Sequence, residues 1–324
     1  MERDNIFIGR RLIKLALQQA RYSEYLTMAG LRREHLVCPV FVSEKALLEG
    51  ITAMPGMVAV TCGGVAPHLQ KIVDAGIKSV IIFGIPGSRD ARGSAAADDK
   101  NGVVQKAVRE IKSAFGMAIN IITDVCVCQY NLSGHCGLLH YGGVENDSTV
   151  RVLAQIAKSH VDAGADVVAP SAMMDGQVKA IREAIGSRAR ILSYSAKHVS
   201  SLYTPFRSAA FAKKGQIDKA SYQVSYASPR QAMREIATDI AEGANMVMIK
   251  PGMAYIDLVK RAKEQFSIPV AVQNVSGEYA MIKAAGMRGW IDEDEWKALS
   301  LASMRRAGAD RIISYFALEV AKCL

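Results

Sequence analysis

The sequence predicts an α/β protein: a (β/α)8 barrel, or TIM barrel, preceded by an N-terminal arm. Eight short apolar runs occur between residues 36 and 316. Most of these runs are continuous rather than alternating, which is typical of strands buried on both faces. Helical patterns separate most of them, and eight strands with crossover helices fit a barrel of about 290 residues. An open doubly wound sheet is the alternative, disfavoured because no G-x-G-x-x-G follows any run.

The chain divides into an arm, residues 1–34, and a barrel domain, residues 35–324. The arm is polar and basic, and the apolar spacing of Ile13, Leu17 and Leu26 indicates at least one amphipathic helix. This helix either packs on its own barrel or contacts a neighbouring subunit.

The elements of the barrel follow one another in a regular order. The expected strands cover residues 36–42, 79–85, 118–123, 166–170, 190–196, 245–249, 268–273 and 310–316. The expected helices cover residues 69–75, 100–115, 149–163, 176–184, 228–241, 255–265, 278–285 and 292–307. Asp147-Ser148 and Ser228-Pro229 are expected N-caps. A helix–glycine–strand phrase recurs four times, at Gly76, Gly164, Gly243 and Gly308, and is typical of αβ junctions.

Composition and charge narrow the function classes. Hydrophobic residues make up 50% of the chain, enough for a large core, and the net charge is +9. This charge indicates either a basic surface or an anionic substrate. It does not indicate nucleic acid, because the basic residues are scattered and no aromatic stacking platform accompanies them. No apolar run reaches the ~18 residues of a membrane span, and the N-terminus lacks a signal-peptide pattern. We therefore expect no membrane partner and a cytoplasmic location, which the short cysteine spacings also favour.

The end of the third strand carries a cluster of metal-ligand residue types. Asp124 is followed by Cys126 and Cys128, and the next loop brings His135 and Cys136. Cysteines at i and i+2 of an extended chain point to the same side, and a glycine-containing loop can return a third. Three sulfurs suit zinc and leave one position open for catalysis. The alternatives are a structural metal clip or buried free thiols, and His135 either ligates or orients a metal-bound water.

Lysines end the fifth and sixth strands, at Lys197 and Lys250. In a barrel, such side chains point into the mouth where active sites lie. Burial and a neighbouring cation both lower a lysine pKa, and a neutral amine can form a Schiff base with a carbonyl. Two lysines imply either one nucleophile with a cationic helper or two covalently held substrates. The alternative is that each lysine reaches solvent where the chain turns.

A long basic segment, residues 203–223, separates these two strands and is expected to be a lid or a disordered loop. Within it, Arg207 and Lys219 are candidates for binding a carboxylate, although a solvated loop explains them equally well. Ser276 and Tyr315, after the seventh strand and in the eighth run, are candidates for presenting hydroxyls to a carboxylate.

These residues occur in motifs that resemble one family over nearly the whole chain. The motifs include Asp124-x-Cys-x-Cys, Gly134-His-Cys-Gly, Ser193-Tyr-Ser-Ala-Lys, Ile249-Lys-Pro-Gly-Met-Ala-Tyr and Val275-Ser-Gly-Glu-Tyr-Ala-Met-Ile. The chain resembles porphobilinogen synthase, also called 5-aminolevulinate dehydratase. The resemblance implies a hydro-lyase that condenses two molecules of 5-aminolevulinate to porphobilinogen, with loss of two waters, early in tetrapyrrole (haem) synthesis.

The resemblance also implies roles for individual residues. Lys250 would form a Schiff base with the first substrate, Lys197 would serve the second, and Asp124 would transfer a proton or orient zinc-bound water. Zinc would be held by Cys126, Cys128 and Cys136. The remaining implied residues are Arg207 and Lys219 for one carboxylate, Ser276 and Tyr315 for the other, Gln223 on the lid, and Glu235 for an activating magnesium at a subunit interface. The family is typically a homo-octamer in which N-terminal arms contact neighbouring barrels.

The chain departs from the family pattern at some positions. Lys219 stands where an arginine is expected, and a lysine cannot bind a carboxylate through two parallel hydrogen bonds. Ser133 stands where the metal loop usually has a histidine, and His198 where the family usually has phenylalanine. Two rival functions fit less well. A class I aldolase needs one lysine and no thiol cluster, and a zinc-stabilised nucleic-acid module needs four ligands and a basic face.

Overall fold

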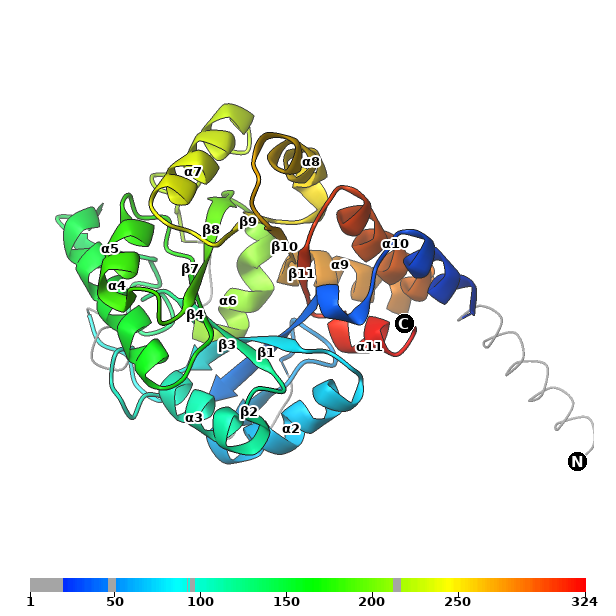
Figure 1. Cartoon of the computed structure of the whole chain (residues 1–324), viewed down its shortest axis with the longest axis horizontal. Helices are drawn as coiled ribbons and strands as arrows, with labels where there is room; N and C mark the ends of the chain where they lie inside the picture. The colour runs from blue at the N-terminus through cyan, green and yellow to red at the C-terminus, as the bar shows by residue number, and fades with distance from the viewer. Residues whose placement is uncertain (1–19, 46–50, 92, 94–96, 212–216) are drawn as a thin grey trace, which may run out of the picture.

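Eight parallel strands close into a barrel in the computed structural model, which describes residues 20–45, 51–91, 93, 97–211 and 217–324 (Figure 1). In order around the ring they are β1 (Leu36–Ser43), β3 (Ser79–Ile85), β4 (Asn120–Val125), β7 (Val167–Pro170), β8 (Arg190–Lys197), β9 (Met246–Lys250), β10 (Val270–Asn274) and β11 (Arg311–Ser314). Leu36 of β1 pairs with Ile312 of β11, which closes the ring. The predicted barrel is therefore confirmed, and the open sheet is excluded.

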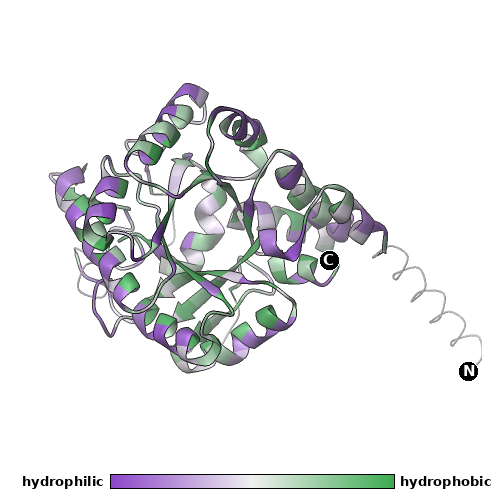
Figure 2. Ribbon diagram, in the orientation of Figure 1, coloured by the Kyte–Doolittle hydropathy of each residue, from purple (hydrophilic) through white to green (hydrophobic). Residues whose placement is uncertain are grey.

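The strands coincide with the eight apolar runs because both of their faces are covered. Every residue of β1 and β3 is buried. Figure 2 shows hydrophobic strands inside a ring of helices whose outer faces are hydrophilic. One strand face fills the barrel and the other packs under helices, so a continuous apolar run is needed.

All eight expected helices are present, with shifted ends. They are α2 (Cys62–Asp74), α3 (Val103–Phe115), α4 (Asn146–Asp162), α5 (Gln177–Ile185), α7 (Pro229–Ala241), α8 (Ile256–Gln265), α9 (Ser276–Met287) and α10 (Glu293–Arg306), followed by a short α11 (Ala317–Ala321). The N-cap at Ser228 is confirmed, since its side chain accepts a hydrogen bond from the backbone N–H of Gln231. The N-cap predicted at Asp147-Ser148 is wrong. The Glu145 carboxylate caps this helix two residues before Asp147, accepting hydrogen bonds from the backbone N–H groups of Asp147 and Ser148.

The recurring helix–glycine–strand phrase has one structure throughout. Its four glycines, Gly76, Gly164, Gly243 and Gly308, have φ values of 80°, 108°, 104° and 111°, which favour glycine at a helix C-terminus. Three of the four phrases continue with the same contact. An Asp or Asn lies directly before the strand that follows the glycine. Its side chain accepts one hydrogen bond from a backbone N–H of the neighbouring strand, the one that comes earlier in the chain. It accepts another from a basic side chain on the helix that leads into that neighbouring strand. The three sets are Asp166 with Ile121 and Lys112, Asn245 with Ile191 and Arg182, and Asp310 with Val270 and Lys263.

Short elements escaped the sequence prediction. β2 (Ala59–Thr61) pairs with β1 at the rim, and β5 (Leu138–His140) forms a hairpin with β6 (Gly143–Glu145). The basic segment predicted as a loop begins at the end of η2 (Ser201–Tyr203) and contains the helix α6 (Thr204–Phe211), which is seen through the ring of strands in Figure 1. Three-residue strands are too short to produce a recognisable hydrophobic period.

The described part of the arm packs on its own barrel. Residues 20–28 are helical and lie beside α10 (Figure 1). Tyr22 and Leu26 are buried, and the Tyr22 hydroxyl donates to the Asp292 carboxylate at 2.7 Å. Residues 1–19 lie outside the described residues, so contact with a neighbouring subunit stays a prediction. Among the helices of the described residues, none has the length and apolar character needed to cross a membrane.

Candidate active site

The C-terminal ends of the barrel strands surround one pocket, which we call the barrel pocket. It contains every residue predicted to be catalytic or substrate-binding, together with two of the cysteines. Its lining is Phe83, Asp124, Cys128, Cys136, Ser171, Lys197, Tyr203, Phe206, Arg207, Lys219, Gln223, Lys250, Gln273, Val275, Ser276 and Tyr315. This is the end of a (β/α)8 barrel at which active sites are found.

The two strand-end lysines lie side by side. Lys197 of β8 pairs in register with Lys250 of β9, and their exposed fractions are only 7% and 8%. Both Nζ atoms lie over the ring of Tyr194, at 5.8 and 5.0 Å from its centroid. The alternative that these lysines reach solvent is therefore wrong.

The surroundings of Lys250 favour its neutral amine. Burial lowers the pKa of Lys250 to about 7, and the neighbouring Lys197 cation acts in the same direction, whereas the Asp124 carboxylate opposes them. Lys197 Nζ donates a hydrogen bond to the backbone carbonyl of Ser171. One lysine thus reaches a pKa at which a neutral nucleophile is abundant near pH 7.

Three cysteines converge beside these lysines. The Sγ atoms of Cys126, Cys128 and Cys136 lie within 4.8 Å of one another, and all three residues are buried. Cys126 and Cys128 follow directly after β4, and the loop returns through Gly134, whose φ of 73° favours glycine. A Cβ at Gly134 would also lie 2.5 Å from Ile217 Cδ1, so a side chain there would displace the end of the Ile217 side chain.

The three cysteine thiols differ in pKa. Hydrogen bonds from Cys126 and Cys128 hold the pKa of Cys136 well below its usual value. Burial raises the pKa of Cys126 well above its usual value. Lys219 Nζ donates to Cys136 Sγ at 3.1 Å. A buried thiolate between two thiols and close to an ammonium is a donor set that fits a soft divalent cation, since such ions bind cysteine as thiolate.

Asp124 is the next-to-last residue of β4 and lines the barrel pocket together with the two lysines and two of the cysteines. Burial raises the pKa of its carboxyl group, and the cation of Lys197 opposes that effect. Its Oδ2 accepts a hydrogen bond from Gln129 Nε2 at 3.2 Å. A carboxyl group with a raised pKa beside a neutral amine is suited to moving protons within a closed pocket.

The candidate carboxylate-binding residues all line the barrel pocket. Arg207 comes from α6, with its guanidinium 5.9 Å from the centroid of the Tyr203 ring. Ser276 Oγ accepts from the backbone N–H of Phe206 and donates to the carbonyl of Leu202, both at 3.1 Å. In this structure the Ser276 hydroxyl therefore joins α9 to α6.

Two predicted residues lie elsewhere. The His135 ring is outside the three-thiol cluster, and its Nδ1 lies 3.2 Å from the Tyr222 hydroxyl. Glu235 of α7 lines a separate pocket that also contains Asn146 and Asp175. Burial and the nearby Asp175 raise the pKa of Glu235. Their metal-related roles stay predictions.

The sequence did not single out several residues that line the barrel pocket. Ser171 follows β7 directly, Phe206 comes from the unforeseen helix α6, and Gln273 interrupts the apolar run of β10. The sequence held a signal for one of these three residues, because Gln273 is a polar residue inside an apolar strand.

The fold and the barrel pocket define a (β/α)8-barrel enzyme with chemically active side chains at the C-terminal ends of its strands. The sequence profile of the family described as delta-aminolevulinic acid dehydratase matches residues 10–323. A protein of that name from Archaeoglobus fulgidus is 43% identical over 313 residues, covering 95% of this chain and 96% of its own. One from Bacillus subtilis is 42% identical over 308 residues, covering 93% and 94%. The chain belongs to the delta-aminolevulinic acid dehydratase family.

A solved structure supports the same assignment. The delta-aminolevulinic acid dehydratase (porphobilinogen synthase) of Toxoplasma gondii, crystallised with the reaction product porphobilinogen, superposes with a TM-score of 0.87. It is 35% identical in sequence, and the match covers 90% of this chain and 85% of that chain.

Proposed function

We propose that this chain is a porphobilinogen synthase, which condenses two molecules of 5-aminolevulinate to porphobilinogen with the release of two waters. The observation that carries the proposal is the pairing of Lys197 with Lys250 in one buried pocket, where the pKa of Lys250 falls to about 7. Membership of the family supports the choice of substrate. The product would be the pyrrole from which haem and other tetrapyrroles are assembled.

Lys250 is the nucleophile in this proposal. Its neutral amine attacks the ketone carbon of the first 5-aminolevulinate, and loss of water leaves a Schiff base. Lys197 serves the second substrate in the same manner. Because the two lysines are level on neighbouring strands, two substrates held on them would be adjacent, as a condensation requires. A class I aldolase needs one such lysine, so the second lysine and the thiols disfavour that rival.

Cys126, Cys128 and Cys136 are the proposed zinc ligands. When bound, zinc would supply Lewis acidity toward the second substrate. Asp124, which lines the barrel pocket together with the two lysines and two of the cysteines, moves protons. His135 is the candidate to orient a ligand or a water from outside the thiol cluster.

The carboxylates of the two substrates are assigned to two groups of residues. Arg207 and Lys219, with Gln223, bind one carboxylate, and Ser276 and Tyr315 bind the other. Glu235 is the proposed ligand of an activating magnesium, since it shares a pocket with Asn146 and Asp175. The proposed assembly is a homo-octamer.

Borohydride reduction tests the assignment of Lys250. Reduction in the presence of 5-aminolevulinate should leave one stable adduct on the peptide that contains Lys250, found by mass spectrometry. Lys250→Met should lose the adduct, whereas Lys71→Met, which removes an exposed lysine of α2, should keep it. Recovery of an unmodified but folded wild-type chain would overturn the proposal.

A further inference from the structure

Gln273 is a buried residue of the barrel pocket, and its amide carbonyl oxygen has no hydrogen-bond partner among the described residues. It is the fourth residue of β10, lines the pocket, and has an exposed fraction of 1%. Its Oε1 is buried and, among the described residues, has no hydrogen-bond donor. The next residue differs: Asn274 donates to the Glu278 carboxylate at 3.0 Å and accepts from the Ser314 hydroxyl at 2.9 Å.

A buried amide oxygen without a partner in such a place indicates a role outside folding. More than nine in ten buried polar groups in proteins have a hydrogen-bond partner, because an unmade bond costs stability. A hydrophobic side chain would fill the same position without that cost. When an orphaned group faces a binding pocket, the simplest source of its missing partner is the ligand.

The strand register places Gln273 beside the nucleophile. Val272 pairs with Ile249, so the next residues along each strand, Gln273 and Lys250, are level on adjacent parallel strands. Both line the barrel pocket. The side chains of Gln273 and Lys250 therefore enter the same pocket from neighbouring strands.

We propose that Gln273 is a catalytic residue whose amide hydrogen-bonds the oxygen on the substrate carbon that Lys250 attacks. This inference rests on the proposed function. Nε2–H donates to the ketone oxygen as the C–N bond forms and the C=O π electrons move to oxygen. That oxygen takes a proton lost by Nζ and, as a hydroxyl, donates to Oε1. The C–O bond then breaks, and the oxygen leaves as water with the second Nζ proton, giving the C=N bond.

The carbonyl oxygen is a better match than the amino group of the substrate. An amino group is cationic when protonated, and the anionic acceptors in the pocket are the Asp124 carboxylate and the Cys136 thiolate. The amide of Gln273 is uncharged and can both donate and accept. That combination suits an oxygen that changes from carbonyl to hydroxyl during the reaction.

The test compares two keto acids in the borohydride reaction. 5-Aminolevulinate carries the amino group, and 4-oxopentanoate has the same ketone and carboxylate without it. Gln273→Leu should slow formation of the Lys250 adduct about 10-fold with both compounds, because each loses one hydrogen bond to the reacting oxygen. A loss confined to 5-aminolevulinate would assign the amide to the amino group and overturn the proposal. Equal rates in variant and wild type would overturn it too.

Stability measurements separate this role from a structural one. Because Leu removes a buried carbonyl oxygen that has no partner, Gln273→Leu should leave Tm unchanged or raise it by about 2 °C. A structural role predicts a lower Tm. The matched control is Gln105→Leu on α3, whose Nε2 donates to Ala97 O and Ser159 Oγ at 2.8 Å. This control should lower Tm and leave the adduct rate unchanged.

Two further measurements separate failure of this inference from failure of the proposed function. Gln273→Met preserves the length of the side chain and should reproduce the slow reaction if Gln273→Leu folds poorly. A normal adduct rate in a folded Gln273→Met overturns the inference. If wild-type protein forms no adduct with either keto acid, the proposed function fails, whatever the variants do.

Discussion

At the scale of single residues, the reactivity of Lys250 comes from its neighbours. Burial removes water from the ammonium, and Lys197 adds a like charge beside it, so the pKa of Lys250 falls to about 7. A carboxylate in the same pocket, Asp124, limits the fall. Removing one of these neighbours should therefore move the pKa in a known direction.

The first prediction concerns the pH dependence of Lys250. With 4-oxopentanoate, which has no amine of its own, adduct trapping by cyanoborohydride should speed up as pH rises through about 7. Lys197→Met removes the like charge, raises the pKa of Lys250, and should shift this midpoint to higher pH. The measurement is the initial rate of adduct formation between about pH 5.5 and 9. An unshifted midpoint in Lys197→Met would show that Lys197 does not act on this amine, and Lys71→Met serves as the unshifted reference.

The sequence predicted site residues where one rule applied: reactive side chains lie at the C-terminal ends of barrel strands. Lys197, Lys250 and Asp124 were found in this way, and the barrel pocket contains all three. Phe206 was missed because its helix α6 interrupts what reads as a basic loop. Gln273 was missed because its lack of a partner is a property of packing, which no local pattern records.

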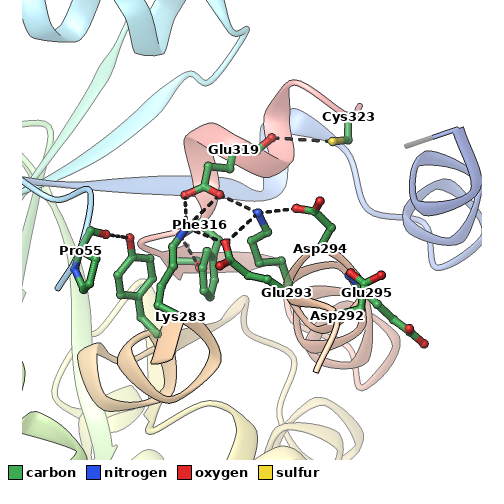
Figure 3. Close-up of polar contacts among 12 residues, drawn as sticks. Pro55, Lys283, Asp292, Glu293, Asp294, Glu295, Phe316, Glu319 and Cys323 are labelled. Atoms are coloured by element: carbon green, nitrogen blue, oxygen red, sulfur yellow. Dashed lines mark hydrogen bonds and ion pairs between the residues drawn. The ribbon is translucent and has the colours of Figure 1, made fainter. Parts of the chain in front are cut away.

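At the scale of elements, the last three helices share a cluster of charges, shown in Figure 3. Lys297 of α10 contacts Glu319 of α11 at 2.7 Å, and Lys283 of α9 contacts the same carboxylate at 3.1 Å. Glu293 contacts Lys283 at 2.7 Å and Lys297 at 3.3 Å. Both lysines also lie over the ring of Phe316, at 5.6 and 6.0 Å. Two largely buried cations are thus paired with a few carboxylates.

The second prediction is that Glu319→Gln destabilises the fold by about 1–2 kcal/mol at pH 7, a value reduced for partial exposure. Burial opposes the charged form of Glu319, but the hydrogen bond and charge of Lys297 lower its pKa below 4.5. A depressed carboxyl pKa stabilises the fold above the unfolded pKa and is lost as pH falls through the folded one. The difference between variant and wild type, measured by urea unfolding, should therefore narrow below about pH 4.5.

The exposed pair Lys260–Glu264 is the matched control for this cluster. Its charged atoms are 3.8 Å apart and its side chains are 70% and 63% exposed. Glu264→Gln should change stability by less than about 0.5 kcal/mol. Equal effects of Glu264→Gln and Glu319→Gln would contradict the assigned importance of the cluster.

The helices and strands predicted correctly from the sequence are those that are long enough to show a hydrophobic pattern and are buried against the rest of the barrel. Eight apolar runs, most of them continuous, correspond to eight strands because each strand is covered on both sides. The cap at α4 was wrong because the hairpin β5–β6, unforeseen at three residues per strand, delivers Glu145 to the helix start. The position at which the chain enters the helix determined the N-cap here, and not the local preference for Asp or Ser.

At the scale of the whole molecule, the barrel brings together two parts of the site that are distant in sequence. The thiols follow β4, and the lysines end β8 and β9, on another part of the ring. Lys219, after α6, contacts the thiol side by donating to Cys136. Because the thiols and the lysines come from different strands, we expect that the proposed metal side and the Schiff-base side can be inactivated separately.

The third prediction follows from this division. Removal of metal with a chelator should abolish porphobilinogen formation, and added zinc should restore it, because the thiols would no longer hold a Lewis acid. The same metal-free protein should still form the borohydride-trapped adduct on Lys250, since that amine is activated by burial and by Lys197. Both readings come from one sample, by product absorbance and by mass spectrometry. Full turnover without metal would remove zinc from the proposed function, and loss of the Lys250 adduct would show that the two sides of the site are not separable.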